Sequence, residues 1–409
     1  MSGKREEVKE KKRFRVKENS EQNEGAKIAD IDKLRKKRSR NAMLKRVLVV
    51  SVVVLAAILV IVGIETAGTR NISIIISDIA AGFTRGDGFP IEIDGATVRD
   101  AEIVGGSLAL LTDSGILVYN KSGGEIKNEL HEYADAAWDV VGNRILAYDV
   151  GGPDLRLDSK SANAFKKKYD EKIITADYSK SGRFAVITET SRRLCELTVY
   201  SKDETEIFKW GSSDNYATAL SLSPNGKFVA VAAVNVEGAR LSSKIIAFSI
   251  TDGKELFRYS IGDKLVLSMD YLSDGRISLI TDSAAITVGK DGSACVEYDF
   301  ANRTLQNWSR GDDGRLALAF EDEIVILGAD TVKLFSQSGT QEIFGNIIHS
   351  DFYKKDLFIS SSNGIYKLSG GQFAQIISDE KLGGQGLKIA VSGNYIYCVL
   401  QDKLECVEK

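Results

Sequence analysis

The chain has 409 residues, of which 27% are charged, and its net charge is −3 at neutral pH. Four cysteines and two histidines in a chain of this length exclude a small disulfide-stapled domain and argue against a zinc site. The small net charge hides an asymmetry, because residues 1–46 carry a net charge of +9 and the remaining residues carry −12.

Residues 1–46 predict a basic tail that is mostly disordered. The segment is rich in lysine, arginine and glutamate, poor in aromatic residues, and without a sustained apolar period. The run from Lys33 to Arg40 suits either a nucleic acid or the anionic surface of a membrane. The apolar stretch that follows favours the membrane, so no nucleic-acid partner is expected.

The stretch Val47–Ile64 reads VLVVSVVVLAAILVIVGI and contains no charged residue and no proline. As a helix, its length would be ~27 Å, close to the thickness of the hydrocarbon core of a bilayer. We predict a single transmembrane signal-anchor. The basic residues before it place the N-terminus in the cytoplasm and residues after Ile64 outside the cell membrane. A cleaved signal peptide is the alternative, but both its charged region and its apolar region would be shorter.

Residues 65–87 are expected to form a juxtamembrane linker that contains a short amphipathic helix. The helix is indicated by apolar residues at helical spacing, namely Ile72, Ile75, Ile76, Ile79 and Phe83. It would either lie on the membrane or pack under the outer domain. Several glycines and Pro90 then end the helical pattern.

From residue 88 to residue 409 the apolar period is two, and short runs alternate with turns rich in Gly, Asp, Asn and Ser. A turn followed by an apolar strand, as at Asn225-Gly226 before KFVAV, recurs eight times. A period near 40 residues with four short strands is typical of a β-propeller blade. We therefore predict an all-β propeller of eight blades, or of seven if residues 142–168 form no blade. Residues 89–93 would close the ring as the missing outer strand of the last blade.

Repeats such as ALSLSPNGKFVAVAA (219–233) resemble WD40-like and quinoprotein-like propeller repeats. The layout also resembles an uncharacterised bacterial family of single-pass, membrane-anchored β-propeller proteins, through GDGFPIEI (86–93), ILAYDVGGPDLRLDSKS (145–161), LTVYSKDETEIFKW (197–210) and ARLSSKI (239–245). That resemblance implies an anchor and a propeller but no activity. These repeats do not end in the Trp-Asp dipeptide typical of WD40 repeats, and they lack the regularly placed tryptophans of quinone-binding propellers.

Two short stretches are candidate sites. The loop formed by Asp149, Gly151, Gly152, Pro153 and Asp154 exposes backbone amides, so it is either a recognition loop or a tight connection within a blade. Cys398 and Cys406 flank a short turn. They would either form a disulfide across a hairpin or remain two buried thiols.

Small or short polar residues recur five residues before the first turn, namely Asp177, Ser221, Asp270, Ser309 and Ser350. They are expected on the innermost strands, where the axis is crowded. Asp177 and Asp270 would either bind a cation or polar ligand in the central channel or hold a neighbouring turn. His349-Ser350-Asp351 is either a fragment of a catalytic site or a strand segment whose side chains are hydrogen-bonded by nearby groups. His131, near Glu132, is likewise either part of a site or a histidine with such local partners.

Three functions compete at this point. The first is a membrane-anchored, extracytoplasmic binding or scaffolding module for a cell-envelope protein or a cell-wall partner. The second is a transmembrane sensor that couples outer ligand binding to the basic tail. The third, an enzyme, lacks support because no nucleophile elbow, phosphate loop, HExxH or dinucleotide motif is found after the predicted anchor. We expect no catalytic residues, no metal site and no cofactor.

Overall fold

The computed structural model describes residues 43, 45–47, 49–52, 73–93, 95, 97–321, 323–328, 331–336, 345–369, 371–382 and 388–409. The chain comprises two compact units, Met1–Ser73 and Ile74–Lys409. No helix in the described residues is long and apolar enough to cross a membrane. Residues 1–42 of the predicted tail, 53–64 of the predicted anchor and 65–72 of the predicted linker lie outside the described part of the chain.

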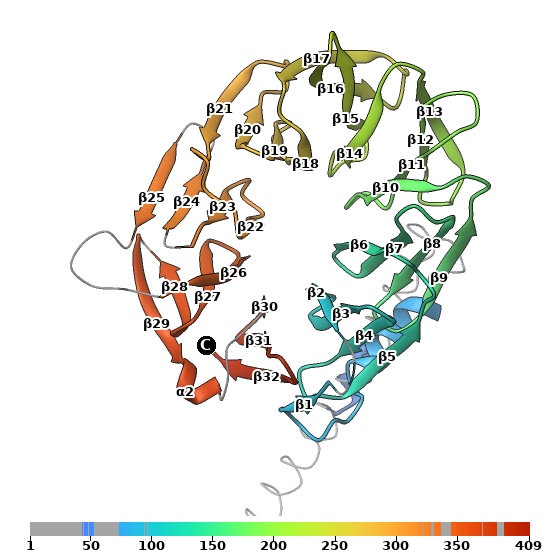
Figure 1. Ribbon diagram of the computed structural model, residues 1–409. Coiled ribbons are helices and arrows are strands. Elements are labelled where there is room, and N and C mark those ends of the chain that lie inside the picture. Colours follow the sequence, from blue (N-terminus) through green and yellow to red (C-terminus); the bar gives the residue numbers. More distant parts are fainter. Residues whose placement is uncertain are drawn as a thin grey trace, which may run out of the picture. The chain divides into compact units, whose positions relative to one another are not determined.

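The second unit is a β-propeller of eight four-stranded antiparallel sheets around a central axis (Figure 1). Blade 1 consists of β2 (Val98–Val104), β3 (Ser107–Thr112), β4 (Gly115–Tyr119) and β5 (Glu125–Leu130); blade 2 of β6 (Ala136–Val141), β7 (Arg144–Asp149), β8 (Asp154–Ser159) and β9 (Asn163–Lys168). Blade 3 consists of β10 (Ile173–Tyr178), β11 (Phe184–Thr188), β12 (Cys195–Tyr200) and β13 (Glu206–Ser212); blade 4 of β14 (Tyr216–Leu222), β15 (Phe228–Glu237), β16 (Arg240–Ser249) and β17 (Glu255–Gly262).

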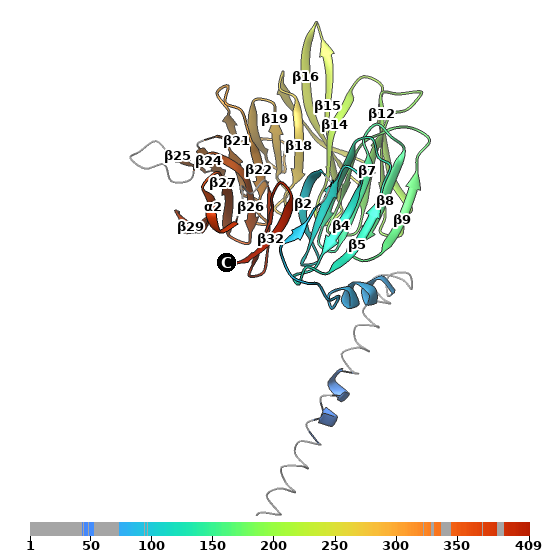
Figure 2. The same cartoon turned by 60° about the horizontal axis from the view of Figure 1, so that its bottom comes forward.

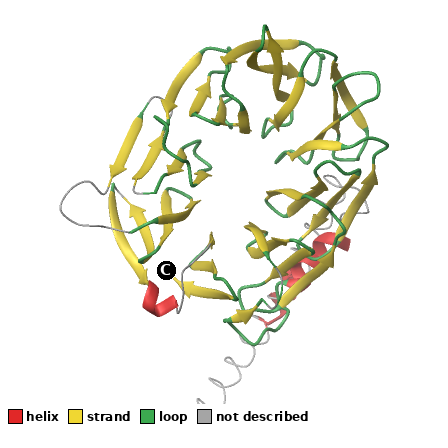
Figure 3. Cartoon of the chain, viewed as in Figure 1, coloured by secondary structure: helices red, strands yellow, loops and turns green. Residues whose placement is uncertain are grey.

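The other half of the ring repeats this order, and its strands cover the rest of the circle (Figure 3). Blade 5 consists of β18 (Val266–Tyr271), β19 (Ile277–Thr281), β20 (Ala284–Val288) and β21 (Ala294–Asp299); blade 6 of β22 (Asn307–Arg310), β23 (Leu316–Ala319), β24 (Glu323–Leu327) and β25 (Val332–Ser336). Blade 7 consists of β26 (Ile347–Tyr353), β27 (Asp356–Ser361), β28 (Gly364–Ser369) and β29 (Gln372–Ser378), and the short helix α2 (Asp379–Leu382) follows it.

Blade 8 closes the ring with strands from both ends of the propeller. It combines β30 (Lys388–Ser392), β31 (Tyr395–Val399) and β32 (Lys403–Glu408) with β1 (Ile91–Glu92), which pairs antiparallel with β32 through Ile91 and Leu404. This confirms both the eight blades and the predicted closure. Residues 142–168, the doubtful unit, lie in an ordinary blade.

The core is divided among the eight junctions between blades. Each of eight apolar clusters joins two neighbouring sheets, and together they account for most of the buried aliphatic side chains. Because each sheet packs between two neighbouring sheets, a strand such as β3 (SLALLT) is buried on both of its faces. Burial of each large aliphatic side chain contributes about 1.5–3 kcal/mol, so the ring is held together by many equivalent junctions.

Residues 73–81 form the helix that the apolar spacing predicted. Its Asp78 side chain accepts hydrogen bonds from Ser159 Oγ (2.7 Å), at the end of β8, and from Ser161 Oγ (2.6 Å), in the loop between β8 and β9. After the helix, the Thr84 carbonyl accepts a bond from Asn120 Nδ2 at 2.7 Å. Gly86 then passes so close to the loop after β4 that a Cβ would lie 2.1 Å from the Gly124 nitrogen. The helix is therefore fixed to blades 1 and 2.

The loops of the propeller alternate between two faces, because consecutive strands within each blade are antiparallel (Figure 2). One face carries the loops that join the first strand to the second and the third to the fourth. Their proximity is seen where Gly105 N donates to Gly142 O (2.8 Å) and Lys160 Nζ donates to Gly105 O (3.5 Å). The other face carries the loops between the second and third strands and the connections between blades.

Candidate functional site

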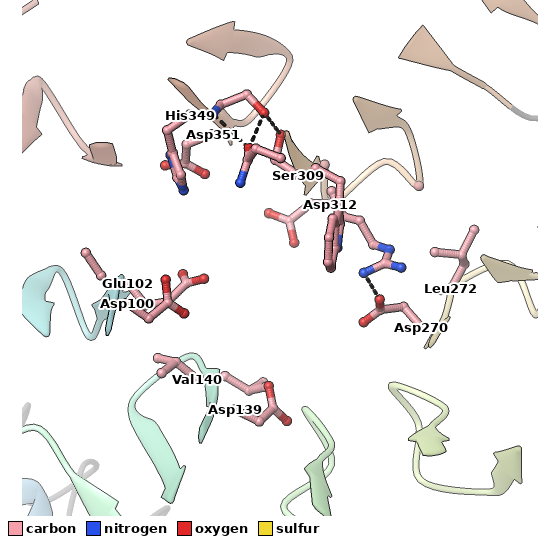
Figure 4. A pocket seen from close by; sticks show the side chains of 18 of the residues that line it. Asp100, Glu102, Asp139, Val140, Asp270, Leu272, Ser309, Asp312, His349 and Asp351 are labelled. Carbon is pink, nitrogen blue, oxygen red and sulfur yellow. Dashed lines mark hydrogen bonds and ion pairs between the residues drawn. The ribbon is translucent and has the colours of Figure 1, made fainter. Parts of the chain in front are cut away.

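The innermost strands surround a cavity of about 600 Å³ on the axis (Figure 4). Its walls are polar and carry several carboxylates, of which Asp100, Glu102, Asp139, Asp270 and Asp351 line it directly. It also extends to loops of the first face, where Lys180 and Asp312 form an ion pair at 2.9 Å. The pair joins blade 3 to blade 6, so it spans the end of the cavity.

Most of these polar groups connect one blade to the next. Asp139 accepts a hydrogen bond from Tyr178 N, Asp177 from Leu222 N, and Ser221 from Tyr271 N. The same geometry recurs where Asp351 accepts from Val391 N at 2.9 Å. An inner-strand side chain thus satisfies a backbone donor of the following blade, which would otherwise be left unpaired near the axis.

The remaining four junctions use other polar pairs of the same strands. Asp100 contacts both neighbours of blade 1, through Lys388 Nζ (3.1 Å) and Trp138 Nε1 (3.0 Å). Asp270 forms an ion pair with Arg310, and Asn307 Oδ1 accepts from Ser350 N at 2.9 Å. Every junction between blades therefore has a polar contact at the axis. Asp177 and Asp270, the predicted channel residues, are part of this ring, and each contacts a neighbouring strand rather than a turn.

The position of four carboxylates near the axis, Glu102, Asp139, Asp177 and Asp351, raises their pKa values. Its position deep inside the ring and then the carboxylates of Asp100, Asp351 and Asp139 raise the pKa of Glu102 to about 8. Burial raises the pKa of Asp351 to about 7, against the opposing effect of its bond from Val391 N. Burial also raises the pKa values of the adjacent Asp139 and Asp177. The cavity thus carries fewer negative charges near neutral pH than its composition indicates.

His349-Ser350-Asp351 lies on the inner strand β26, as predicted, but its side chains do not act on one another. Ser350 Oγ donates to Asn307 Oδ1 at 2.9 Å, and His349 Nδ1 accepts from Ile389 N at 3.4 Å. Burial lowers the pKa of His349 to about 4, so the imidazole is neutral at neutral pH. His131 stacks on Tyr133 with 4.6 Å between ring centroids. The contact of His349 agrees with the structural alternative. His131 is satisfied only in part, because its Nδ1 accepts from Tyr133 N at 3.3 Å while its Nε2 is buried without a hydrogen-bond partner.

The predicted recognition loop connects β7 to β8 and has hydrogen bonds on both sides. Asp149 accepts from Asp135 N at 3.0 Å, and Gly151 N donates to Ile173 O at 2.8 Å. Ile173 N donates to Gly152 O at 2.8 Å, and Tyr169 N to Pro153 O at 2.9 Å. The loop is therefore a tight connection. Gly151 is exposed and the Asp154 side chain partly so, and recognition by this loop stays a prediction.

The alternative of two unbridged thiols describes Cys398 and Cys406, since all four cysteines are free. Register explains why the bridge does not form: Cys398 lies opposite Glu405, and Cys406 lies opposite Tyr397. Residues directly opposite each other share a face of the sheet, so the two thiols leave opposite faces. Cys398 packs between blades 7 and 8, whereas Cys406 packs toward blade 1.

Sequence reasoning missed Glu102, Asp139 and Lys388. Its rule counted back five residues from the first turn, which holds where that turn is long, as after Asp177 in blade 3. Blades 1 and 2 have two-residue turns at Gly105-Gly106 and Gly142-Asn143, so the equivalent residue lies closer to the turn. Asp139 lies only three residues before Gly142, so a count of five residues passes over it.

A second feature lies on the face opposite the helix. β15 and β16 have ten residues each and form a hairpin that extends beyond its neighbours (Figure 2). Pairing with β14 ends at Val234, and pairing with β17 ends at Ser243. Beyond these points the hairpin exposes Val236 (70%) and Leu241 (37%), and Tyr216 (57%) lies opposite Val234.

Two solved structures have a similar fold. The β-propeller domain of Cps50 (Swd1) from Myceliophteria thermophila has 10% identity and a TM-score of 0.48, covering 69% of this chain and 99% of that domain. The C-terminal WD40 domain of Sif2 has 11% identity and a TM-score of 0.53, covering 80% of this chain and 99% of that domain. At this low identity the likeness to the Sif2 domain supports the fold alone.

No curated protein matches the sequence. A family model described as a family of unknown function (DUF5711) matches residues 91–341, which is most of the propeller. The chain therefore belongs to this family, whose function is not known.

Proposed function

We propose that the protein is a membrane-anchored β-propeller that binds, outside the cytoplasm, a protein or cell-wall partner of the cell envelope. The fold supports the general part of this proposal, since propellers present loops from a rigid ring and commonly serve as interaction scaffolds. The anchor rests on the apolar stretch Val47–Ile64 and the basic residues that precede it.

The observation that carries the binding role is the hairpin of β15 and β16. Its end exposes an apolar pair, Val236 opposite Leu241, on strands that no neighbouring strand covers there. An extension with these side chains serves no purpose in the ring's own packing, and exposed apolar groups that cluster are typical of interaction sites. A partner that covers Val236, Leu241 and Tyr216 would remove this apolar surface from water.

A binding role also fits the axial cavity better than catalysis does. Most of the cavity's carboxylates, namely Asp100, Asp139, Asp270 and Asp351, are engaged in contacts between blades, so changing their protonation or position would disturb those junctions. Within the described residues, no group of three or more His, Cys, Asp or Glu is arranged to hold a metal ion. We therefore assign the polar axis to the integrity of the ring and the loops to binding.

A photo-crosslinking amino acid at Val236 of the full-length protein in cells tests this proposal. It should capture a small, specific set of extracytoplasmic proteins or cell-wall fragments, identified by mass spectrometry. The substitutions Tyr216→Asp and Leu241→Asp should reduce the capture. Leu256, which is 46% exposed at the other end of blade 4, is the matched control position. Equal capture from both positions, or exclusively cytoplasmic partners, would contradict the proposal.

A second candidate is the transmembrane sensor, which the axial cavity favours. Its volume of about 600 Å³ would hold a small polar ligand, whose binding would be reported by the basic tail. Deletion of residues 1–40 separates the two functions. It should abolish a cellular response if the protein is a sensor, and it should leave capture from Val236 unchanged if the protein is a scaffold.

A further inference from the structure

The helix at residues 73–81 has two distinct sides. Ile74, Ser77 and Asp78 face the propeller, and Ile74 and Asp78 are each only 9% exposed. The opposite side carries Ile76 (61% exposed) and Ile79 (54%), three residues apart. Phe83 (82%), four residues after Ile79, lies in the turn that directly follows the helix. Ile75 (40%) borders the same side. The exposed side is therefore a continuous apolar stripe that the propeller does not cover.

The face that holds this helix is basic. We define the basic face by the loops between the first and second and between the third and fourth strands of the blades. Their described charged residues comprise twelve basic and seven acidic side chains: Lys121, Lys160, Lys180, Arg183, Lys202, Lys227, Lys254, Arg276, Lys290, Arg315, Lys354 and Lys355, against Asp203, Glu204, Asp252, Asp274, Asp291, Asp312 and Asp313.

The opposite face has the reverse balance. We define the acidic face by the loops between the second and third strands and by the connections between blades. Where the structure describes their side chains, these loops hold twelve acidic and six basic residues: Asp113, Glu132, Asp135, Asp170, Glu171, Glu189, Asp214, Asp263, Asp282, Glu321, Glu380 and Asp402, against Lys172, Arg192, Arg193, Lys264, Arg303 and Lys381. The hairpin of β15 and β16 extends from this face.

We infer that the basic face rests on the surface of a lipid bilayer with anionic headgroups, into which the helix inserts Ile76, Ile79 and Phe83. The apolar stripe suits the boundary between headgroups and acyl chains, and the lysines around it suit anionic headgroups. The inference rests on the anchor of the proposed function, because the predicted span ends at Ile64, only ten residues before Ile74. Such a short connection keeps this side of the propeller near the same membrane.

This arrangement also determines which side of the propeller meets a partner. If the basic face lies on the bilayer, the acidic face and the hairpin at Val236 point away from it. The hydrogen bonds that Asp78 accepts from Ser159 and Ser161 would hold blade 2 in a fixed orientation relative to the helix, and so orient the ring on the membrane. The helix is thus both a membrane contact and a rigid spacer.

Depth-dependent quenching in liposomes tests the inference with the full-length protein. A fluorophore is attached to Ala80→Cys, on the exposed side of the helix, or to Val236→Cys on the hairpin. Both proteins carry Cys295→Ser and Cys406→Ser, because the other two cysteines are buried. The vesicles contain doxyl-labelled lipid in phosphatidylcholine, with or without phosphatidylglycerol.

We expect the label at residue 80 to be quenched about two-fold more strongly than the label at residue 236, and more so with phosphatidylglycerol. High salt should reduce the difference between the two lipid mixtures. The triple substitution Ile76→Ser, Ile79→Ser and Phe83→Ser should remove most of the quenching at residue 80. The control triple Leu130→Ser, Leu267→Ser and Leu334→Ser, at exposed apolar residues away from the helix and the hairpin, should leave it unchanged.

The outcomes separate this inference from the anchor. If the protein floats with the vesicles but both labels are quenched equally, the anchor stands and the inference is wrong. If the protein does not float with the vesicles, both the anchor and the inference are wrong. Folding of the serine variants is checked by circular dichroism. The comparison of quenching at residues 80 and 236 does not need these variants, so it tests the inference even if they fail to fold.

Discussion

The basic and the acidic face of the propeller are built from the same repeated blade, yet they differ in charge and in what they carry. On the basic face, loops contact the helix at residues 73–81 through Asp78, and they contact the segment after it through the bond from Asn120 to Thr84 and the close approach of Gly86. On the acidic face, one hairpin extends freely and exposes Val236. The packing of the strands accounts for the ring. The ring needs loops at both ends of each blade, but it does not determine which residues those loops contain. The difference between the faces therefore points to function rather than to folding.

The largest expected effect comes from a buried charge cluster of blades 1 and 2, beneath the helix. Asp158 is fully buried and contacts Lys127 Nζ (2.7 Å) and Arg156 Nη2 (2.6 Å). Asp158→Ala would remove the buried carboxylate that two buried cations share, leaving Arg156 with the partly exposed Glu129 (3.2 Å) and Lys127 with the neutral Asn163 (2.8 Å), and should reduce the free energy of unfolding by about 3–5 kcal/mol. Urea denaturation of the full-length protein measures this.

Asp154→Ala is the matched control for that substitution, four residues away on the same strand. Asp154 and Lys168 form an exposed pair at 3.9 Å, so the loss should be about 0–1 kcal/mol. Similar losses for the two variants would show that the cluster under the helix has no special role.

The next effect concerns the attachment of the helix to the basic face. Asp78→Ala removes three hydrogen bonds from a buried carboxylate and should cost about 1.5–3 kcal/mol locally. Hydrogen exchange should accelerate at the amides of residues 74–81 and remain unchanged in β15 and β16. Asp87→Ala, at an exposed position, is the control. Unchanged exchange at residues 74–81 would contradict the attachment.

Much of this architecture could be predicted because it is repeated. The turns before each second strand gave the eight blades, and the incomplete last unit gave the closure by Ile91. The spacing of Ile76, Ile79 and Phe83 predicted the helix, but it could not show which side packs, because Ser77 and Asp78 bond to Ser161, which is 84 and 83 residues away in the sequence. The ring of polar contacts at the axis depends on the register between blades, which a single sequence does not display.

A smaller effect is expected from pH, through the axis that joins the two faces. Because the pKa of Asp351 is raised to about 7 in the folded protein and is near 4 in an unfolded chain, the folded state binds the proton more tightly. Asp351 therefore contributes a destabilisation that is absent below about pH 4, grows as pH rises, and is complete above about pH 7.

Asp351→Asn keeps an acceptor for Val391 N and removes this titration. Relative to the unsubstituted protein, the variant should gain about 1–2 kcal/mol of stability between pH 5 and pH 8, since water in the cavity weakens the full effect. The opposing titration of His349 is present in both proteins and cancels. A difference that is constant over this range would contradict the raised pKa.

The smallest effect is expected at the closing blade. Because Cys398 and Cys406 lie on opposite faces of their sheet, a reducing agent should leave the melting temperature unchanged. Cys406→Ser should change the free energy of unfolding by about 0.5 kcal/mol or less, as is usual for a partly exposed site away from special features. Stabilisation by oxidation would mean that the register of β31 and β32 is wrong.

The most direct test of the difference between the faces is photo-crosslinking from both of them in the same cells. Crosslinkers are placed at Ala80 and at Val236 of the full-length protein, and the products are sorted into lipid and protein adducts. Our account predicts mainly lipid adducts from Ala80 and specific extracytoplasmic protein or cell-wall adducts from Val236. Protein adducts from Ala80 with lipid adducts from Val236, or the same products from both, would contradict it.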